Sequence, residues 1–212
     1  MSADIEKIVL SYLPEIDGFQ KTAIEAMHDA VKAGGKRVRP RIMYETYVMF
    51  CKKNGKEADE RIIGPFMAGM EIMHTASLIH DDLPCMDNDT LRRGKPTTWV
   101  TYGVDMATLT GDAMMIEALG VMADAVTRMD DKNAGSKAVA IMAKKSGLFG
   151  MTGGQVVDVE NTGKPINKEQ LDYIYKNKSR NKGNLIIYPR DSKVMRRGGI
   201  NKQLRAEIYY KI

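Results

Sequence analysis

The sequence predicts an all-α protein, a single-domain bundle of several helices. Apolar residues recur at spacings of three and four along most of the chain, and no segment alternates convincingly with a period of two. A chain of 212 residues is long enough to bury a sizeable core in one domain. With 16 methionines and only 7% aromatic residues, that core is expected to be aliphatic and rich in Met, as suits an irregular apolar cavity.

The first three expected helices are bounded by recognisable signals. The first helix is expected to start at Ser2 and to stop at Pro14. The second ends at the glycine pair that begins with Gly34, a common C-terminal stop. Pro40 suits the first turn of the third helix, which is expected to end near Gly55.

Longer apolar segments follow, over residues 62–80, 106–126 and 136–151. The last two are rich in small residues, which allow helices to approach closely. Asn167 and Gln170 have the spacing of a capping box, which predicts a further helix over residues 168–178. Beyond Lys178 the pattern changes, and Pro189 is expected to block a continuous helix there.

The charge is unevenly distributed. Residues 1–178 contain 23 basic and 25 acidic residues, a balance of −2, whereas residues 179–212 contain nine basic and two acidic residues, a balance of +7. We therefore expect a helical domain over residues 1–178 and an atypical basic tail over residues 179–212. The tail lacks the interleaved aromatic residues or amphipathic stripe of a nucleic-acid or membrane-surface binder, so neither partner is expected.

The remaining composition points to the cytoplasm. Cys51 and Cys85 form no ligand cluster and no disulfide framework, which favours a reducing compartment. We expect no signal peptide. We also expect no apolar run of roughly 20 residues, the length that a membrane span needs.

The most informative stretch is SLIHDDLPCMDNDTLRRG, in which an apolar helix leads into a group of aspartates. A carboxylate cluster can be a solvated surface, a helix cap or a site for a hard cation. Pro84 should break the helix after Asp82, and the resulting bend can bring Asp81 and Asp87 together. Carboxylate oxygens suit Mg²⁺, which is usually held by one or two carboxylates and by substrate phosphates.

A second motif, GGKRVRP, places Lys36, Arg37 and Arg39 after a glycine pair. An ordinary basic loop is the simplest interpretation. Cations at a helix N-terminus are unfavourable, however, unless they face an anion. Together with Arg92 and Arg93, which can donate to phosphate oxygens, these residues suggest two phosphorylated substrates or one very large one.

The motifs GGKRVRP, MHTASLIHDDLPCMDNDTLRRGKPT, LTGDA and GMTGGQVVDVE occur in an order and spacing that resemble the trans-type isoprenyl diphosphate synthases. The resemblance covers residues 1–178 and is closest to the bacterial farnesyl and geranylgeranyl diphosphate synthases. It implies the helical bundle of the isoprenoid synthases and a homodimer. It also implies a reaction in which Mg²⁺ assists ionisation of an allylic diphosphate, and isopentenyl diphosphate then attacks the carbocation.

The resemblance also implies roles for individual residues. Asp81 and Asp87 would bind Mg²⁺, with Asp82 in support. The isopentenyl diphosphate would be held by Lys36, Arg39, His74 and Arg93. The allylic diphosphate would be held by Arg92 and Lys178, with Ser179 in place of the usual threonine. Gln155 is a further candidate at the cavity, whereas His80 is expected to have a structural role.

Product length in this family depends on the bulk just before the first aspartate, which here means Ala76 and Ser77. Farnesyl or geranylgeranyl diphosphate is expected, and the small Ala76 favours the longer product. The chain departs from the family after Lys178, where no second aspartate-rich motif follows. We therefore expect a chain that lacks the C-terminal helices of full-length relatives. A catalytically impaired homologue and a non-catalytic subunit remain open alternatives.

Overall fold

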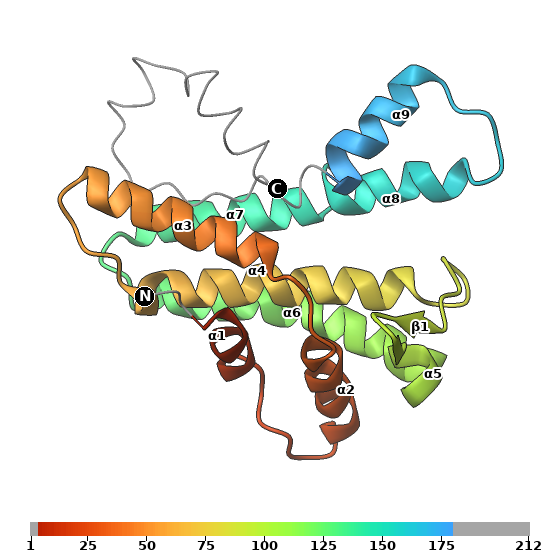
Figure 1. Cartoon of the computed structure of the whole chain (residues 1–212), viewed down its shortest axis with the longest axis horizontal. Coiled ribbons are helices and arrows are strands. Elements are labelled where there is room, and N and C mark those ends of the chain that lie inside the picture. Colours follow the sequence, from red (N-terminus) through yellow and green to blue (C-terminus); the bar gives the residue numbers. More distant parts are fainter. Residues whose placement is uncertain (1–3, 180–212) are drawn as a thin grey trace.

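The computed structural model describes residues 4–179, which form a helical bundle (Figure 1). The helices are α1 Ile5–Ser11, α2 Lys21–Lys32, α3 Val38–Lys53, α4 Glu60–Asp81, α5 Thr98–Tyr102, α6 Val104–Thr127, α7 Lys132–Ser146, α8 Met151–Glu160 and α9 Lys168–Ile174. A π-helical turn, η1 (Tyr175–Ser179), follows α9, and a short antiparallel hairpin, β1 (Leu91–Arg92) and β2 (Lys95–Pro96), precedes α5. The predicted all-α fold is confirmed. Strands of two residues are too short to produce a period-two pattern.

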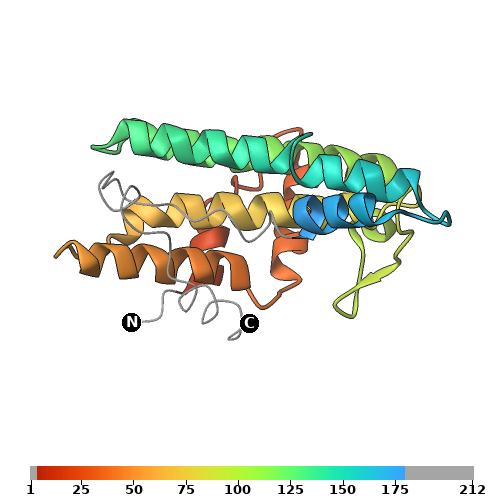
Figure 2. The ribbon, with the colours of Figure 1, turned by 90° about the horizontal axis from the view of Figure 1, so that it is seen from above.

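Helix α4 lies at the centre of the bundle. It packs most extensively against α6 and also contacts α1 and α3. Figure 2 shows α4 between α3 on one side and α7 and α8 on the other. The close approach of α4 to α6 depends on Gly69, because a Cβ atom added there would come within 2.7 Å of the Ala118 carbonyl oxygen. Gly69 lies outside the two segments predicted to pack closely through small residues, although its neighbour Ala118 belongs to one of them.

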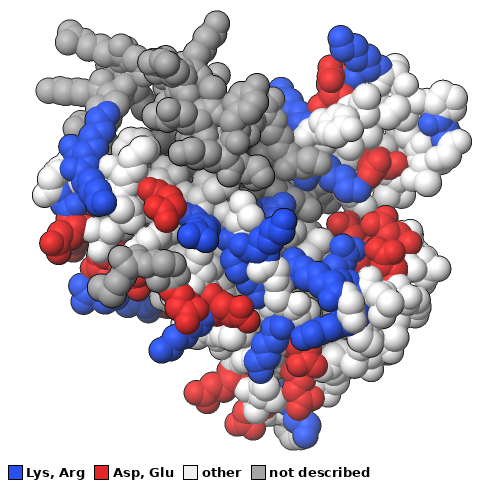
Figure 3. All heavy atoms as spheres, viewed as in Figure 1, with Lys and Arg blue, Asp and Glu red and all other residues white. Residues whose placement is uncertain are grey.

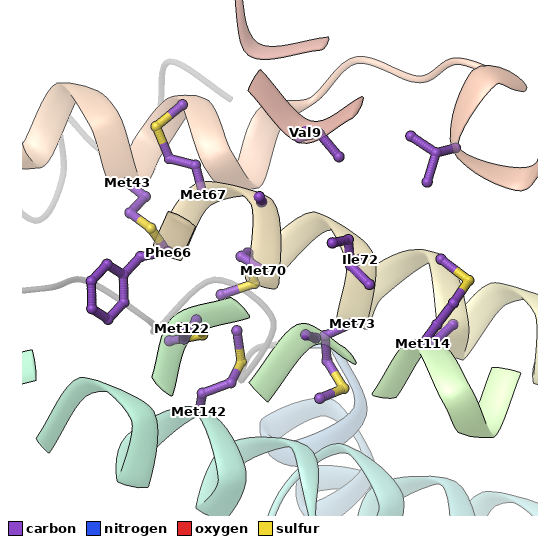
Figure 4. Close-up of a cluster of buried hydrophobic side chains, with 14 of the residues drawn as sticks. Val9, Met43, Phe66, Met67, Met70, Ile72, Met73, Met114, Met122 and Met142 are labelled. Atoms are coloured by element: carbon purple, nitrogen blue, oxygen red, sulfur yellow. The ribbon is translucent and has the colours of Figure 1, made fainter. Parts of the chain in front are cut away.

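The core is rich in methionine, as the composition predicts. Met43 of α3, Met67 of α4, Met114 and Met122 of α6 and Met142 of α7 are almost completely buried. Figure 4 shows these side chains filling the space between the helices, together with Phe66 and Ile72 of α4. Flexible thioether side chains suit such irregular gaps between helices.

Several predicted boundaries are confirmed and one is wrong. Pro40 lies in the first turn of α3, and Asn167 and Gln170 form the predicted capping box. The first helix begins later than predicted: Asp4, not Ser2, caps α1, and its carboxylate accepts a hydrogen bond from the Lys7 N–H. The predictions for residues 180–212, including the break at Pro189, lie outside the described residues.

The prediction that no apolar run is long enough to span a membrane is wrong as far as length and composition go. Both α4 and α6 are long and apolar enough by length and composition alone. The apolar stretch of α4 is mostly buried inside the protein, as in a core helix, whereas only a third of the stretch in α6 is buried.

Candidate functional site

The end of α4 positions the first two candidate metal ligands. The helix ends at Asp81, before Pro84, and a turn follows. The N–H of Asp87 donates to the carbonyl oxygen of Asp81 at 2.9 Å, so these two residues are backbone neighbours although they are six positions apart. Asp81 is partly buried and Asp87 is exposed. The bend predicted at Pro84 therefore brings the two residues together.

Asp82 has a different environment. Its side chain is buried, and both of its oxygens accept from Arg92, with 2.8 Å between Oδ1 and Nε and 3.1 Å between Oδ2 and Nε. Arg92 also reaches Asp89 at 3.2 Å. Burial raises the pKa of Asp82, and the contact with Arg92 opposes this only in part. The hydrogen bond to Asp82 raises the pKa of Arg92. Asp82 thus holds Arg92 in place, and its predicted support of the Mg²⁺ ligands stays a prediction.

The hairpin places the next arginine. Arg93 and Gly94 both have left-handed backbone conformations at its turn, with φ of 55° and 77°. The guanidinium of Arg93 lies against Gly35, where an added Cβ would come within 2.6 Å of Nη1. Because Gly35 has no side chain, Arg93 can approach the loop that carries the other predicted cations.

Three of the four residues assigned to isopentenyl diphosphate come together beside this loop. The Nη1 atom of Arg39 lies 3.2 Å from Nε2 of His74. Burial lowers the pKa of Arg39; the nearby Glu71 raises it, and Arg93 lowers it further. The fourth residue, Lys36, is exposed on the same loop. Figure 3 shows Lys and Arg side chains crossing the middle of this face, next to a group of acidic side chains.

A buried ion pair beneath this group was missed from the sequence. Nη1 of Arg37 lies 2.7 Å from Oε1 of Glu71, and the two side chains are 7% and 3% exposed. Nη2 of Arg37 donates to the carbonyl oxygen of Val31. Arg37 adopts a left-handed conformation with φ of 47°. The signal was present in the sequence, since Glu71 is the one acidic residue between Glu60 and Asp81.

The other residues assigned to the allylic diphosphate lie on a separate pair of helices. Lys178 of η1 forms an ion pair with Asp158 of α8. Gln155 is partly buried on α8. Ser179 ends η1, and its side chain lies outside the described part of the structure. A π-helical turn at Lys178 is notable because such turns often occur at functional sites.

The residues assigned to product length lie inside the bundle. Ala76 is completely buried, and Ser77 is 6% exposed. The hydroxyl of Ser77 donates to the carbonyl oxygen of His74. His80 packs against α6, with Nε2 3.4 Å from Asp112 and 3.3 Å from the Thr108 carbonyl oxygen. These contacts agree with a structural role for His80.

The donor set fits Mg²⁺. Within residues 4–179, no three His, Cys, Asp or Glu side chains are grouped closely enough to form a complete metal site. The neighbouring Asp81 and Asp87 supply only oxygen donors, and Mg²⁺ is normally held by few carboxylates and completed by phosphate oxygens and water.

Comparison with known proteins defines the family. The sequence profile of the family described as Polyprenyl synthetase matches residues 20–200. The chain therefore belongs to the polyprenyl synthetase family. It is 36% identical over 179 residues to a farnesyl diphosphate synthase of Geobacillus stearothermophilus, with 82% of this chain and 57% of the relative covered.

A second relative is a heterodimeric geranylgeranyl pyrophosphate synthase large subunit 1, a chloroplastic protein of Arabidopsis thaliana. The two chains are 42% identical over 159 residues, which cover 73% of this chain and 41% of the relative. Among solved structures, an FPP/GFPP synthase of Zymomonas mobilis superimposes with a TM-score of 0.77 at 31% identity, covering 85% of this chain and 63% of that one. The chain spans about half the length of the curated relatives it matches.

Proposed function

We propose that the chain is a short-chain prenyltransferase that joins isopentenyl diphosphate to an allylic diphosphate and forms farnesyl or geranylgeranyl diphosphate. The main support is the position of the Asp81–Asp87 pair close to Arg92, with the group formed by Arg39, His74 and Arg93 nearby. A carboxylate pair with separate cationic groups suits two diphosphates and a divalent cation.

The chain's own residues divide the two substrates between them. Arg39, His74 and Arg93, with Lys36 at the exposed edge, bind isopentenyl diphosphate and orient its double bond. Arg92 and Lys178 bind the allylic diphosphate, Lys178 after releasing Asp158 and Arg92 while still held by Asp82. Ser179 belongs to the same group as Lys178, and Gln155 is a further candidate at the cavity.

Asp81 and Asp87 would hold Mg²⁺, which neutralises the leaving diphosphate and so favours ionisation of the allylic C–O bond. No protein nucleophile is required, because the double bond of isopentenyl diphosphate supplies the electrons and a proton is then lost. The buried apolar side chains around Ala76 would exclude water from the carbocation.

We propose that the product chain grows toward Ala76 and Ser77, and that the protein is a homodimer. Support for a second copy comes from α6, which exposes Leu109 and Ile116 at 59% and 74%. Light scattering should give twice the chain mass, and Ile116→Lys should reduce it to that of one chain.

The test of function uses radiolabelled isopentenyl diphosphate with dimethylallyl, geranyl or farnesyl diphosphate, with and without Mg²⁺. Mg²⁺-dependent product formation is expected, together with a loss of at least a hundredfold in Asp81→Asn and Asp87→Asn. Asp124→Asn is the matched control, because Asp124 is exposed on α6 and pairs only with Arg128 within the described residues. Product formation without Mg²⁺, or full activity in both site variants, would refute the proposal.

A catalytically impaired homologue or a non-catalytic subunit is the second candidate. It rests on the change of pattern after Lys178, where residues 179–212 carry nine basic and two acidic residues. Calorimetry with geranyl S-thiolodiphosphate, an unreactive allylic analogue, separates the two. Mg²⁺-dependent binding without turnover supports the second candidate, and absence of binding contradicts both.

A further inference from the structure

We propose that Thr97 and Trp99 are positioning residues, which hold the loop between α4 and β1 in the shape that binds Mg²⁺ and the allylic diphosphate. This acidic loop, residues 82–90, leads from the end of α4 to the hairpin (Figure 1). The hydroxyl of Thr97 donates to the main-chain carbonyl oxygen of Asp89 at 2.9 Å, and Nε1 of Trp99 donates to the same oxygen at 2.8 Å. This role rests on the proposed function, in which Asp87 and Arg92 bind the metal ion and the substrate.

The first half of the acidic loop is held by the end of α4. The N–H of Leu83 donates to the carbonyl oxygen of His80 at 3.2 Å, and the N–H of Asn88 donates to that of Leu83 at 3.1 Å. Asn88 has a left-handed backbone conformation with φ of 55°. Residues other than glycine keep this uncommon conformation where the surrounding structure fixes it. Contacts are therefore also needed on the far side of Asn88.

The second half of the loop is held by the segment that leads into α5. The N–H of Thr97 donates to the carbonyl oxygen of Thr90 at 3.1 Å, next to the two side-chain hydrogen bonds to Asp89. A carbonyl oxygen has two lone pairs, so Thr97 and Trp99 together fill the acceptor capacity of Asp89. The ion pair between Asp89 and Arg92 is 51% and 31% exposed, and such pairs contribute little. The two hydrogen bonds to the carbonyl oxygen are therefore the firmer attachment.

Both donors are themselves fixed in place. Thr97 is 2% exposed and occupies the N-cap position of α5. A threonine at this position usually accepts a hydrogen bond from its own helix, but the side chain of Thr97 makes no such bond and donates to the acidic loop instead. Trp99 is partly buried and packs against the hydrophobic core. Two immobilised donors thus converge on one carbonyl oxygen.

The position of Asp89 connects this contact to the proposed site. Asp89 follows Asp87 by two positions, and its carboxylate contacts Arg92 at 3.2 Å. Releasing the carbonyl oxygen of Asp89 therefore loosens a metal ligand and an allylic diphosphate ligand together. Arg39 and His74 belong to α3 and α4, outside this loop, so the binding of isopentenyl diphosphate depends on it less.

The test is calorimetry on the full chain with geranyl S-thiolodiphosphate and Mg²⁺, and separately with isopentenyl diphosphate. Thr97→Val and Trp99→Phe each remove one donor but keep the bulk, and each should weaken binding of the allylic analogue by about three- to tenfold. The double variant should lose more, whereas the affinity for isopentenyl diphosphate should change by less than about twofold in all three variants.

Two control variants accompany these measurements. Thr97→Ser keeps the hydroxyl and should restore the affinity for the allylic analogue. Thr127→Val removes a hydroxyl of α6 that donates to the Asp124 carbonyl oxygen, away from the acidic loop, and should leave the affinity unchanged.

Fluorescence follows the contact directly, because Trp99 is the one tryptophan of the chain. Acrylamide should quench Trp99 more strongly in Thr97→Val than in the unchanged protein, Thr97→Ser or Thr127→Val, since the loop no longer stays closed over the indole N–H.

The outcomes separate the role of Thr97 and Trp99 from the proposed function. A double variant that melts at a lower temperature but binds the allylic analogue normally when folded would show a merely structural role and overturn the proposal. An equal loss of affinity for both substrates would also overturn it. If the unchanged protein fails to bind the analogue, the proposed function is wrong; equal quenching in Thr97→Val and the unchanged protein would instead refute the hold on the acidic loop.

Discussion

Replacing Glu71 by Gln should destabilise the protein by about 3–5 kcal/mol, the usual cost of removing one partner of a buried ion pair. Gln has nearly the same shape as Glu, so the cavity stays filled, but Arg37 keeps a charge that no carboxylate balances. The two side chains are 7% and 3% exposed, so water cannot replace the lost partner. The Nε atom of Arg37 already lacks a hydrogen-bond partner among the described residues.

The loss is measurable by urea unfolding followed by circular dichroism. A chain of this size has a denaturant dependence of about 2 kcal/mol per molar urea, so the midpoint should fall by about 1.5–2.5 M. Asp124→Asn breaks an exposed pair with Arg128 and is the matched control, with an expected loss below about 1 kcal/mol. A midpoint change in Glu71→Gln as small as that of the control would refute the reasoning.

A compensating variant separates charge from packing. Arg37→Met/Glu71→Leu removes both charges, and such replacements are often neutral or stabilising. Its stability should return to within about 1 kcal/mol of the unchanged protein. The same variant should bind isopentenyl diphosphate more weakly, because Arg37 anchors the loop that leads to Arg39, while the affinity for the allylic analogue should change little.

Three further predictions concern separate parts of the molecule. Ala76→Tyr should shorten the product to farnesyl diphosphate, because the added ring would fill the space beside the buried Ala76 into which the product chain is proposed to grow; chromatography that shows an unchanged product would contradict this. Asp158→Asn should tighten the binding of geranyl S-thiolodiphosphate by up to about fivefold in calorimetry, because Lys178 no longer has to leave a partner; weaker binding would instead make Asp158 a positioning residue. Burial and the hydrogen bond to Asp29 raise the pKa of Tyr102 to about 12, so its contribution to stability is complete below pH 10 and lost as the pH rises through 12; Tyr102→Phe should lack this loss, and a phenolate absorbance step near pH 10 that is smaller by one tyrosine in Tyr102→Phe would contradict the assignment.

The sequence predicted the features of the site that depend on short-range geometry. Pro84 was sufficient to predict the bend, and the backbone contact between Asp81 and Asp87 follows from it. The capping box and most of the helix ends, though not the start of α1, were predictable for the same reason, since a few adjacent residues decide them. Tertiary contacts do not alter such local signals.

The pairing of charges could not be predicted in the same way. Arg37 and Glu71 are 34 positions apart, and Lys178 and Asp158 are 20 positions apart, so only the packing of the helices brings them together. Composition reveals that charges are present but not which of them neutralise each other. This is why Arg37 was grouped with the phosphate-binding cations, although it is buried against Glu71.

The ion pairs of the site fall into two classes with different consequences. The Lys178–Asp158 pair is partly exposed, with side chains 24% and 41% accessible, and such pairs contribute about 0–1 kcal/mol, so a diphosphate can displace Asp158 at little cost. The Arg37–Glu71 pair is buried and cannot be exchanged for a ligand without a large loss of stability. The buried pair therefore fixes the loop before α3. The exposed pair can be exchanged for an anion, as the proposed binding of the allylic diphosphate by Lys178 requires.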